Sequence, residues 1–308
     1  MTETAQNILK TLGYFDLFKY PLTAKEIHLF NQADIADAAI HAELQVLLQA
    51  NKIFKVDEFY SLHNNCQLAE RRRNGNKLAA EHLKTAQRVA RFLATFPYVK
   101  AIAVSGSLSK NFATDKTDID FFIITTANRL WIARTCMHLY KKLTFLTGRQ
   151  NWFCMNYYVD EAAMEIKEKN IFTAVEIVTL LPMHGRNCLY EFMEKNRWTD
   201  SFFPLKPFSN TEAPDLPKGI FSRLVEKLFS GSLGDLADTK LMQLTAARWG
   251  RKVKRQQLNS RGGLVGMSVD RHFSKPDPKN FQDKVVKAYR DKVEDIIQQR
   301  KLSALFVL

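Results

Sequence analysis

Two short segments near the middle of the chain have residue types and a spacing that suit metal and phosphate chemistry. Ser105-Gly106-Ser107 ends an apolar run that starts at Ala101, and ten residues later Asp118-Ile119-Asp120 opens a second apolar run. Side chains alternate between the two faces of a strand, so both aspartates should point the same way with Ile119 buried behind them. Like charges at this spacing repel each other unless a cation or solvent compensates. The Asp pair therefore predicts a divalent-metal clamp, and the alternative is two aspartates that cap a hairpin in solvent.

The Gly-Ser turn favours the metal clamp, because it supplies the second half of a nucleotide site. Gly106 allows close approach of the backbone to a ligand, and a short helix starting near Ser107 would direct N–H groups at a phosphate. Mg²⁺, or Mn²⁺ in its place, binds carboxylates and keeps coordination positions open for phosphates. Ser105, Gly106 and Ser107 are thus candidate nucleotide-binding residues. Lys110, just past the turn, and Arg134, on the next expected helix, are candidates for contacts with the phosphates.

This pattern resembles the signature of the DNA polymerase β-like nucleotidyltransferase superfamily. The matching residues are Val104, Gly106, Ser107, Asp118, Ile119, Asp120 and Phe121. More loosely, segments 130–134, 153–157 and 196–198 resemble bacterial nucleotidyltransferase-domain proteins of undefined substrate. The resemblance covers residues 80–165 as a catalytic core. It implies transfer of a nucleoside monophosphate from a nucleoside triphosphate to an acceptor hydroxyl, with Asp118 and Asp120 as catalytic metal ligands and pyrophosphate as the second product.

The superfamily pattern also implies a third carboxylate on a later strand. The expected strand is Asn151 to Val159, whose even-numbered residues should share one face, and Asn156 takes the catalytic position there. An amide oxygen can bind a metal but brings no charge and cannot act as a base. Asp160, which has the same parity, is the candidate third metal ligand, with Glu161 as its alternative. If neither serves, the alternatives are a weak enzyme or a nucleotide-binding regulator with a degenerate site, which binds nucleotides without turnover.

Composition narrows the class of protein. The chain has 308 residues, 46% of them hydrophobic, and no run of about 20 apolar residues, so we expect no membrane partner. The first fifteen residues lack a basic segment followed by an apolar stretch, which argues against a signal peptide. The four cysteines form no CxxC pair and the seven histidines no zinc-type spacing. These features predict a cytoplasmic protein with reduced cysteines.

Charge is distributed unevenly along the chain. The net charge is +13, but residues 1–62 carry a net charge of −3 and residues 217–308 a net charge of +10. A basic region of this kind could attract nucleic acid or another polyanion. The acceptor stays open among RNA, protein and a small molecule, and the basic C-terminal region slightly favours nucleic acid.

The predicted fold class is α+β, with three parts. Residues 1–65 should form a winged-helix-like module, with helices near 8–18 and 36–50, a capping box at Thr23 and a hairpin over 52–62. Residues 66–165 should form a small mixed β-sheet nucleotidyltransferase core, led by a polar stretch over 64–76 and a linker helix over 77–96. Residues 166–308 should form a helical domain, entirely helical apart from the stretch Phe203 to Pro217.

A further alternative for the function of the chain is a winged-helix nucleic-acid-binding protein. The composition of the expected third helix tests this alternative. A DNA-reading module should place Arg or Lys on the exposed face of this helix. Residues 36–50 contain neither, but they do contain Asp37 and Glu43. A packing or partner-docking role is therefore favoured over DNA binding.

Overall fold

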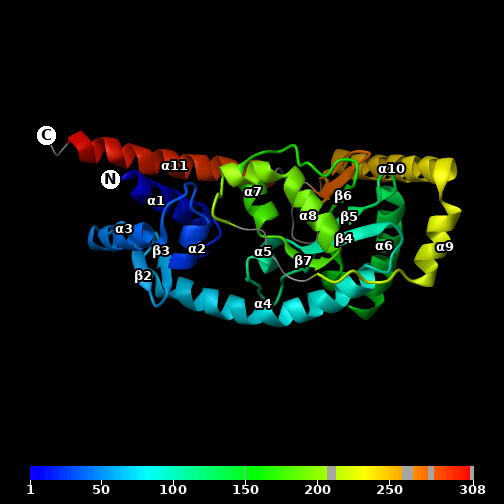
Figure 1. Ribbon diagram of the computed structural model, residues 1–308, viewed down its shortest axis with the longest axis horizontal. Coiled ribbons are helices and arrows are strands. Elements are labelled where there is room, and N and C mark those ends of the chain that lie inside the picture. The colour runs from blue at the N-terminus through cyan, green and yellow to red at the C-terminus, as the bar shows by residue number, and fades with distance from the viewer. Residues whose placement is uncertain (149, 207–212, 259–265, 277–280, 306–308) are drawn as a thin grey trace.

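The computed structural model describes residues 1–148, 150–206, 213–258, 266–276 and 281–305. Residues 207–212, within the stretch predicted to be non-helical, lie outside the described residues. Figure 1 shows a group of short helices at one end, a central sheet, and helices α9 and α10 at the other end. The long helix α4 runs beneath the molecule and joins these parts, while α11 returns along the opposite side to lie beside α1.

The N-terminal part contains three helices and a three-stranded antiparallel sheet of order β1-β3-β2. Its elements are α1 (Glu3–Asp16), β1 (Leu22–Thr23), α2 (Ala24–Leu29), α3 (Asp37–Gln49), β2 (Phe54–Val56) and β3 (Phe59–Ser61). The capping box at Thr23 is confirmed. Its hydroxyl accepts a hydrogen bond from the Glu26 N–H at 3.2 Å, and the Glu26 carboxylate accepts one from the Thr23 N–H at 2.9 Å. This reciprocal pair satisfies two N–H groups at the start of α2.

Helix α4 (Cys66–Leu93) starts eleven residues before its predicted start, so the expected polar stretch over 64–76 is mostly helical. The cause is a set of tertiary contacts that local sequence does not reveal. Arg72 is buried, donates hydrogen bonds to the Pro21 carbonyl and the Glu26 carboxylate, both at 2.6 Å, and lies 3.8 Å from the centre of the Tyr20 ring. Arg72 thereby ties α4 to the N-terminal helices.

The central sheet has six strands in the order β7-β4-β5-β6-β9-β8, and it confirms the predicted mixed sheet. Only β5 and β6 pair in parallel, across the connection made by α6. Its strands are β4 (Val99–Val104), β5 (Asp120–Thr125), β6 (Cys154–Asp160), β7 (Leu181–His184), β8 (Met267–Val269) and β9 (Phe273–Pro276). Helices α4 and α6 cover one face and α7 and α8 the other.

The remaining helices are α5 (Gly106–Ser109), α6 (Leu130–Thr144), α7 (Ile171–Val178), α8 (Arg186–Lys195), α9 (Ile220–Leu228), α10 (Gly231–Lys254) and α11 (Phe281–Leu305). The prediction that the chain beyond residue 165 is entirely helical outside 203–217 was wrong, since β7, β8 and β9 lie there and join the central sheet. The sheet therefore crosses the predicted domain boundary at residue 165. Across the described ranges, none of the helices combines the length and apolar character needed to span a bilayer.

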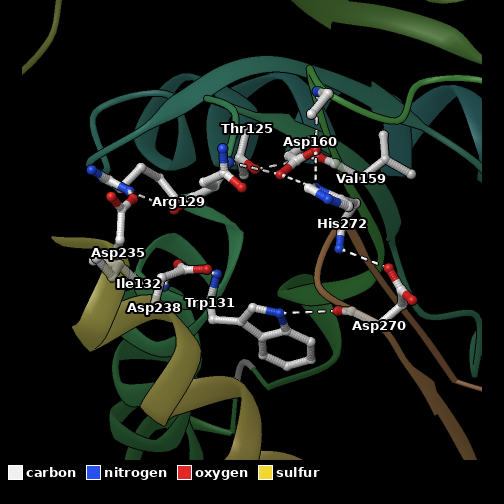
Figure 2. Close-up of polar contacts among 12 residues, drawn as sticks. Thr125, Arg129, Trp131, Ile132, Val159, Asp160, Asp235, Asp238, Asp270 and His272 are labelled. Atoms are coloured by element: carbon white, nitrogen blue, oxygen red, sulfur yellow. Dashed lines mark hydrogen bonds and ion pairs between the residues drawn. The ribbon is translucent and has the colours of Figure 1, made fainter. Parts of the chain in front are cut away.

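Helix α10 is fixed to the start of α6 by buried polar contacts (Figure 2). The Asp238 carboxylate accepts hydrogen bonds from the backbone N–H groups of Trp131 and Ile132 at 2.8 and 2.9 Å, both through one oxygen. Beside it, Arg129 donates to Asp235 at 2.6 Å. Asp238 thus caps α6 from a helix more than 100 residues away in sequence, in place of a local N-cap side chain.

Asp238→Ala is expected to lower the free energy of unfolding by about 2 kcal/mol, because two buried N–H groups lose their acceptor. Asp238→Asn is the matched control, since its side-chain oxygen can accept the same two hydrogen bonds. Chemical denaturation of the three proteins measures the difference. Equal stability of the Ala and Asn variants would contradict the capping role.

The same pair of proteins also gives a pH test. Burial raises the pKa of Asp238 to about 6, above the ordinary value of about 3.9. The stability of the wild type relative to Asp238→Asn should therefore be greatest below about pH 4 and should fall as the pH rises through about 6. Denaturation curves at pH 4, 5, 6 and 7 measure this trend, and a difference that grows with pH would contradict it.

Candidate functional site

A cavity of about 740 Å³ opens where β4 ends and where β5 and β6 begin. The structure brings most of the predicted site residues to this cavity. They are Ser105, Gly106, Ser107, Lys110, Asp118, Asp120 and Asn156. Other parts of the wall come from α1, α7, β9 and α11, with single residues from α4, α8 and α10. Residues from both ends of the chain thus meet the central segments at one place.

The Gly-Ser turn and the Asp pair are in direct contact. Gly106 has a φ of +70°, a left-handed conformation that favours glycine, and a Cβ added to it would lie 2.7 Å from a carboxylate oxygen of Asp120. The Ser105 N–H donates a hydrogen bond to the Asp120 carbonyl at 2.9 Å. The first turn of α5 therefore packs closely against the Asp120 side chain.

Asp118 and Asp120 both line the cavity, and Ile119 between them is buried on the opposite side. Strand β5 begins at Asp120, so Asp118 belongs to the loop just before it. The Ile119 N–H donates a hydrogen bond to the carbonyl of Asn151, in the turn just before β6, at 3.0 Å. This backbone contact joins the loop before β5 to the segment before β6.

Lys110 reaches the cavity but is engaged by protein groups. Its ammonium donates to the Gly106 carbonyl at 2.9 Å and to the carboxylate of Glu176 on α7 at 2.8 Å. Lys110 therefore braces the turn that touches Asp120. Glu176 itself was not predicted, and the sequence signal for it is a lone carboxylate in the apolar helix IFTAVEIV.

Strand β6 enters the site with an irregularity at Asn156. The pairing with β5 shifts there, from Phe121 opposite Met155 to Phe122 opposite Tyr157. Cys154, Asn156 and Tyr157 consequently all line the cavity. The predicted shared face of the even-numbered residues was wrong at residue 158, because the shift buries Tyr158 on the other face of the sheet.

Cys154 is a further residue that the sequence did not single out. Burial, together with the nearby negative charge of Asp120, raises the pKa of its thiol to about 12. The thiol is therefore protonated at neutral pH and can donate a hydrogen bond to a carboxylate.

Asp160, Glu161 and Arg134 do not line the cavity. Asp160 pairs with Thr125 at the far end of β5 and is fully buried. It accepts hydrogen bonds from the Asn128 N–H at 2.8 Å and from His272, and Figure 2 shows the contact with His272. The shift at Asn156 also places Asp160 on the opposite parity to the Asp pair. Glu161 instead pairs with Lys100 at 3.1 Å.

Arg134 is held on the other side of the sheet. It is nearly buried and lies 5.4 Å from the Trp131 ring, and its guanidinium contacts the Met267 sulfur at 3.7 Å. Burial lowers the pKa of Arg134. It is thus part of the packing between α6, α10 and β8 rather than of the cavity.

The described part of the cavity offers a cation few protein donors. Among the described residues, no three His, Cys, Asp or Glu side chains gather into a metal-holding group. Asp118 and Asp120 supply two carboxylates, and the Asn156 amide adds one neutral oxygen at the same cavity. Mg²⁺ commonly binds one or two carboxylates and completes its shell with substrate phosphates and water.

Comparison of the chain with protein-family models, with curated proteins and with solved structures found no match.

Proposed function

We propose that this chain is a metal-dependent nucleotidyltransferase, which moves a nucleoside monophosphate from a nucleoside triphosphate to an acceptor hydroxyl. The observation that carries the proposal is the contact between Gly106 and Asp120 inside one cavity. A phosphate-binding turn and a carboxylate pair, which are separate in sequence, are packed against each other. A cation bound by the carboxylates would therefore lie beside phosphates bound by the turn.

Each group has a role in the proposed reaction. Asp118 and Asp120 hold Mg²⁺ or Mn²⁺, with the Asn156 oxygen as a neutral third donor. Ser105, Gly106 and Ser107 bind the triphosphate, and Lys110 holds the turn in place through the Gly106 carbonyl. The metal ion, when bound, neutralises charge on the phosphates.

The bonds change in one displacement. The acceptor oxygen bonds to the α-phosphorus, the bond from that phosphorus to the bridging oxygen breaks, and pyrophosphate leaves. The hydroxyl proton passes to a carboxylate of the pair and then to solvent.

One observation favours a second candidate, a regulator that binds nucleotide without turnover. Asn156 stands where the superfamily resemblance implies a carboxylate, and neither Asp160 nor Glu161 lines the cavity to replace it. A transferase would need two carboxylates to be enough for catalysis, whereas a regulator needs only to bind the nucleotide.

The N-terminal part supports a packing role more than DNA binding. The order of its helices and strands supports the winged-helix-like interpretation. Helix α3 carries no Lys or Arg, and Asp37 and His41 are exposed on it. We infer that residues 1–65 serve chiefly to complete the cavity, to which they contribute Tyr14, Phe15, Phe18 and Tyr20.

The test is to incubate the protein with α-phosphate-labelled nucleoside triphosphates, Mg²⁺ or Mn²⁺, and an extract of its source cells. Transfer of label together with pyrophosphate release supports the transferase. Metal-dependent nucleotide binding without transfer supports the regulator. Salt-sensitive DNA binding with no nucleotide binding would contradict both.

A further inference from the structure

A large part of the cavity wall beyond the Asp pair is aromatic. Tyr14, Phe15, Phe18, Tyr20, Phe112 and Phe172 line it from α1, from the loops after α1 and α5, and from α7. Many of these rings contact other rings edge-on, such as Tyr20 with Phe112 at 5.9 Å between centroids. A cavity of about 740 Å³ with a few polar groups and an apolar wall has the size and chemistry of a small-molecule site.

The aromatic part has one polar group without a protein partner. Tyr14 is 2% exposed and lines the cavity, and within the described part of the chain its hydroxyl makes no hydrogen bond. Burial raises the pKa of Tyr14 well above its ordinary value, so the hydroxyl stays protonated and can donate. A buried hydroxyl without a partner is costly, and a ligand atom at this point would remove the cost.

The charges along the wall do not suit a polynucleotide. Arg71, Lys110 and Lys275 are matched in number by Asp118, Asp120 and Glu176. Lys110 is paired with Glu176, and Lys275 contacts Glu168 at 3.1 Å. A polynucleotide needs an excess of cations along its path. The wall therefore does not favour RNA or DNA as the acceptor.

The basic end of α10 lies outside the cavity wall. Arg248, Arg251, Lys254 and Arg255 are exposed there, but of the described residues at this end only Trp249 lines the cavity. The positive charge of the C-terminal region thus gives no reason to place a nucleic acid in the site.

We propose, on the premise of the transferase function above, that the acceptor is a small molecule with a planar apolar body. Its hydroxyl faces the Asp pair, and a second polar atom accepts a hydrogen bond from Tyr14. The aromatic walls bind the body of the acceptor, while the Gly-Ser turn and the Asp pair bind the nucleotide.

The test uses naphthalene-2,6-diol as the acceptor probe and Mg²⁺ with α,β-methylene-ATP as a nucleotide that cannot be transferred. We expect both to bind the wild type together, by calorimetric titration of each in the presence of the other. Tyr14→Phe should weaken diol binding about tenfold, the value of one hydrogen bond, and should leave nucleotide binding unchanged. Tyr289→Phe is the matched control, because Tyr289 contacts the Tyr14 ring but does not line the cavity.

Several results would overturn the proposal. They are absence of diol binding, equal diol affinity in Tyr14→Phe, mutual exclusion of diol and nucleotide, and displacement of the diol by a single-stranded RNA oligomer. Mutual exclusion would mean that the aromatic walls hold the nucleotide base. Diol binding that depends on Tyr14, with no nucleotide binding at all, would overturn the transferase while supporting the aromatic binding site.

Discussion

Asp120→Asn is expected to lower the rate of nucleotide transfer by about 1,000-fold, and Asp118→Asn to do so by a similar factor. Each change removes one negative charge from the pair that holds the cation, and the loss of several kcal/mol of transition-state stabilisation corresponds to this factor. Asn is close to Asp in shape, so the fold should persist. Pyrophosphate release under saturating nucleotide, with circular dichroism on the same samples, measures both effects.

Asp115→Asn is the matched control for these two variants. Asp115 lies in the same loop, three residues before Asp118, but it is exposed and does not line the cavity. It should keep wild-type activity. If Asp118→Asn and Asp120→Asn both retain transfer, the pair is not the metal clamp. If the wild type binds nucleotide without any transfer, and the two variants lose that binding, the regulator is the better description.

The parts of the fold that the sequence predicted are those fixed by local signals. The capping box at Thr23 and the strands around Asp118 depend on residues a few positions apart. The true start of helix α4 could not be predicted from its polar sequence. Gly75, in this part of the helix, packs so closely against the Phe112 ring that a Cβ added to Gly75 would lie 2.3 Å from it. That contact joins segments 37 residues apart and has no local signal.

The strands after residue 165 could not be predicted for the same reason, because they depend on contacts with distant parts of the chain. Strand β7 contains Pro182, which a strand tolerates at the edge of a sheet, and β7 is an edge strand. Strand β9 has four residues and pairs with β6, over 100 positions earlier. Short strands of this kind form because a sheet edge is available, not because their own sequence favours them.

The residues of the candidate site also fall into those predicted from local patterns and those that only tertiary packing brings to the cavity. The Gly-Ser turn and the Asp pair are local patterns, and the structure brings them together in one cavity. Tyr14 and Glu176 come from α1 and α7, which only tertiary packing places at this cavity. Asp160 was predicted by counting alternate residues, and one irregularity at Asn156 reversed that count.

Gly106→Ala is expected to lower transfer about 100-fold without unfolding the protein. The positive φ costs an L-residue roughly 1 to 2 kcal/mol, and the new Cβ would lie 2.7 Å from the Asp120 carboxylate oxygen, which must move. A shift of about 1 Å in a catalytic group can cost about 100-fold in rate. Steady-state kinetics combined with thermal denaturation separates the loss of rate from the loss of stability.

Gly148→Ala provides the matched control, because Gly148 has a φ of +67° and, apart from its chain neighbours, no described residue has an atom within 4 Å of its added Cβ. Both variants carry the same kind of backbone cost, so their melting temperatures should fall by similar amounts. Only Gly106→Ala changes the surroundings of Asp120, and only it should lose activity. Equal activity of the two variants would mean that the contact between the turn and Asp120 does not position the carboxylate. The contact between the Gly-Ser turn and the Asp pair would then no longer support the proposed function.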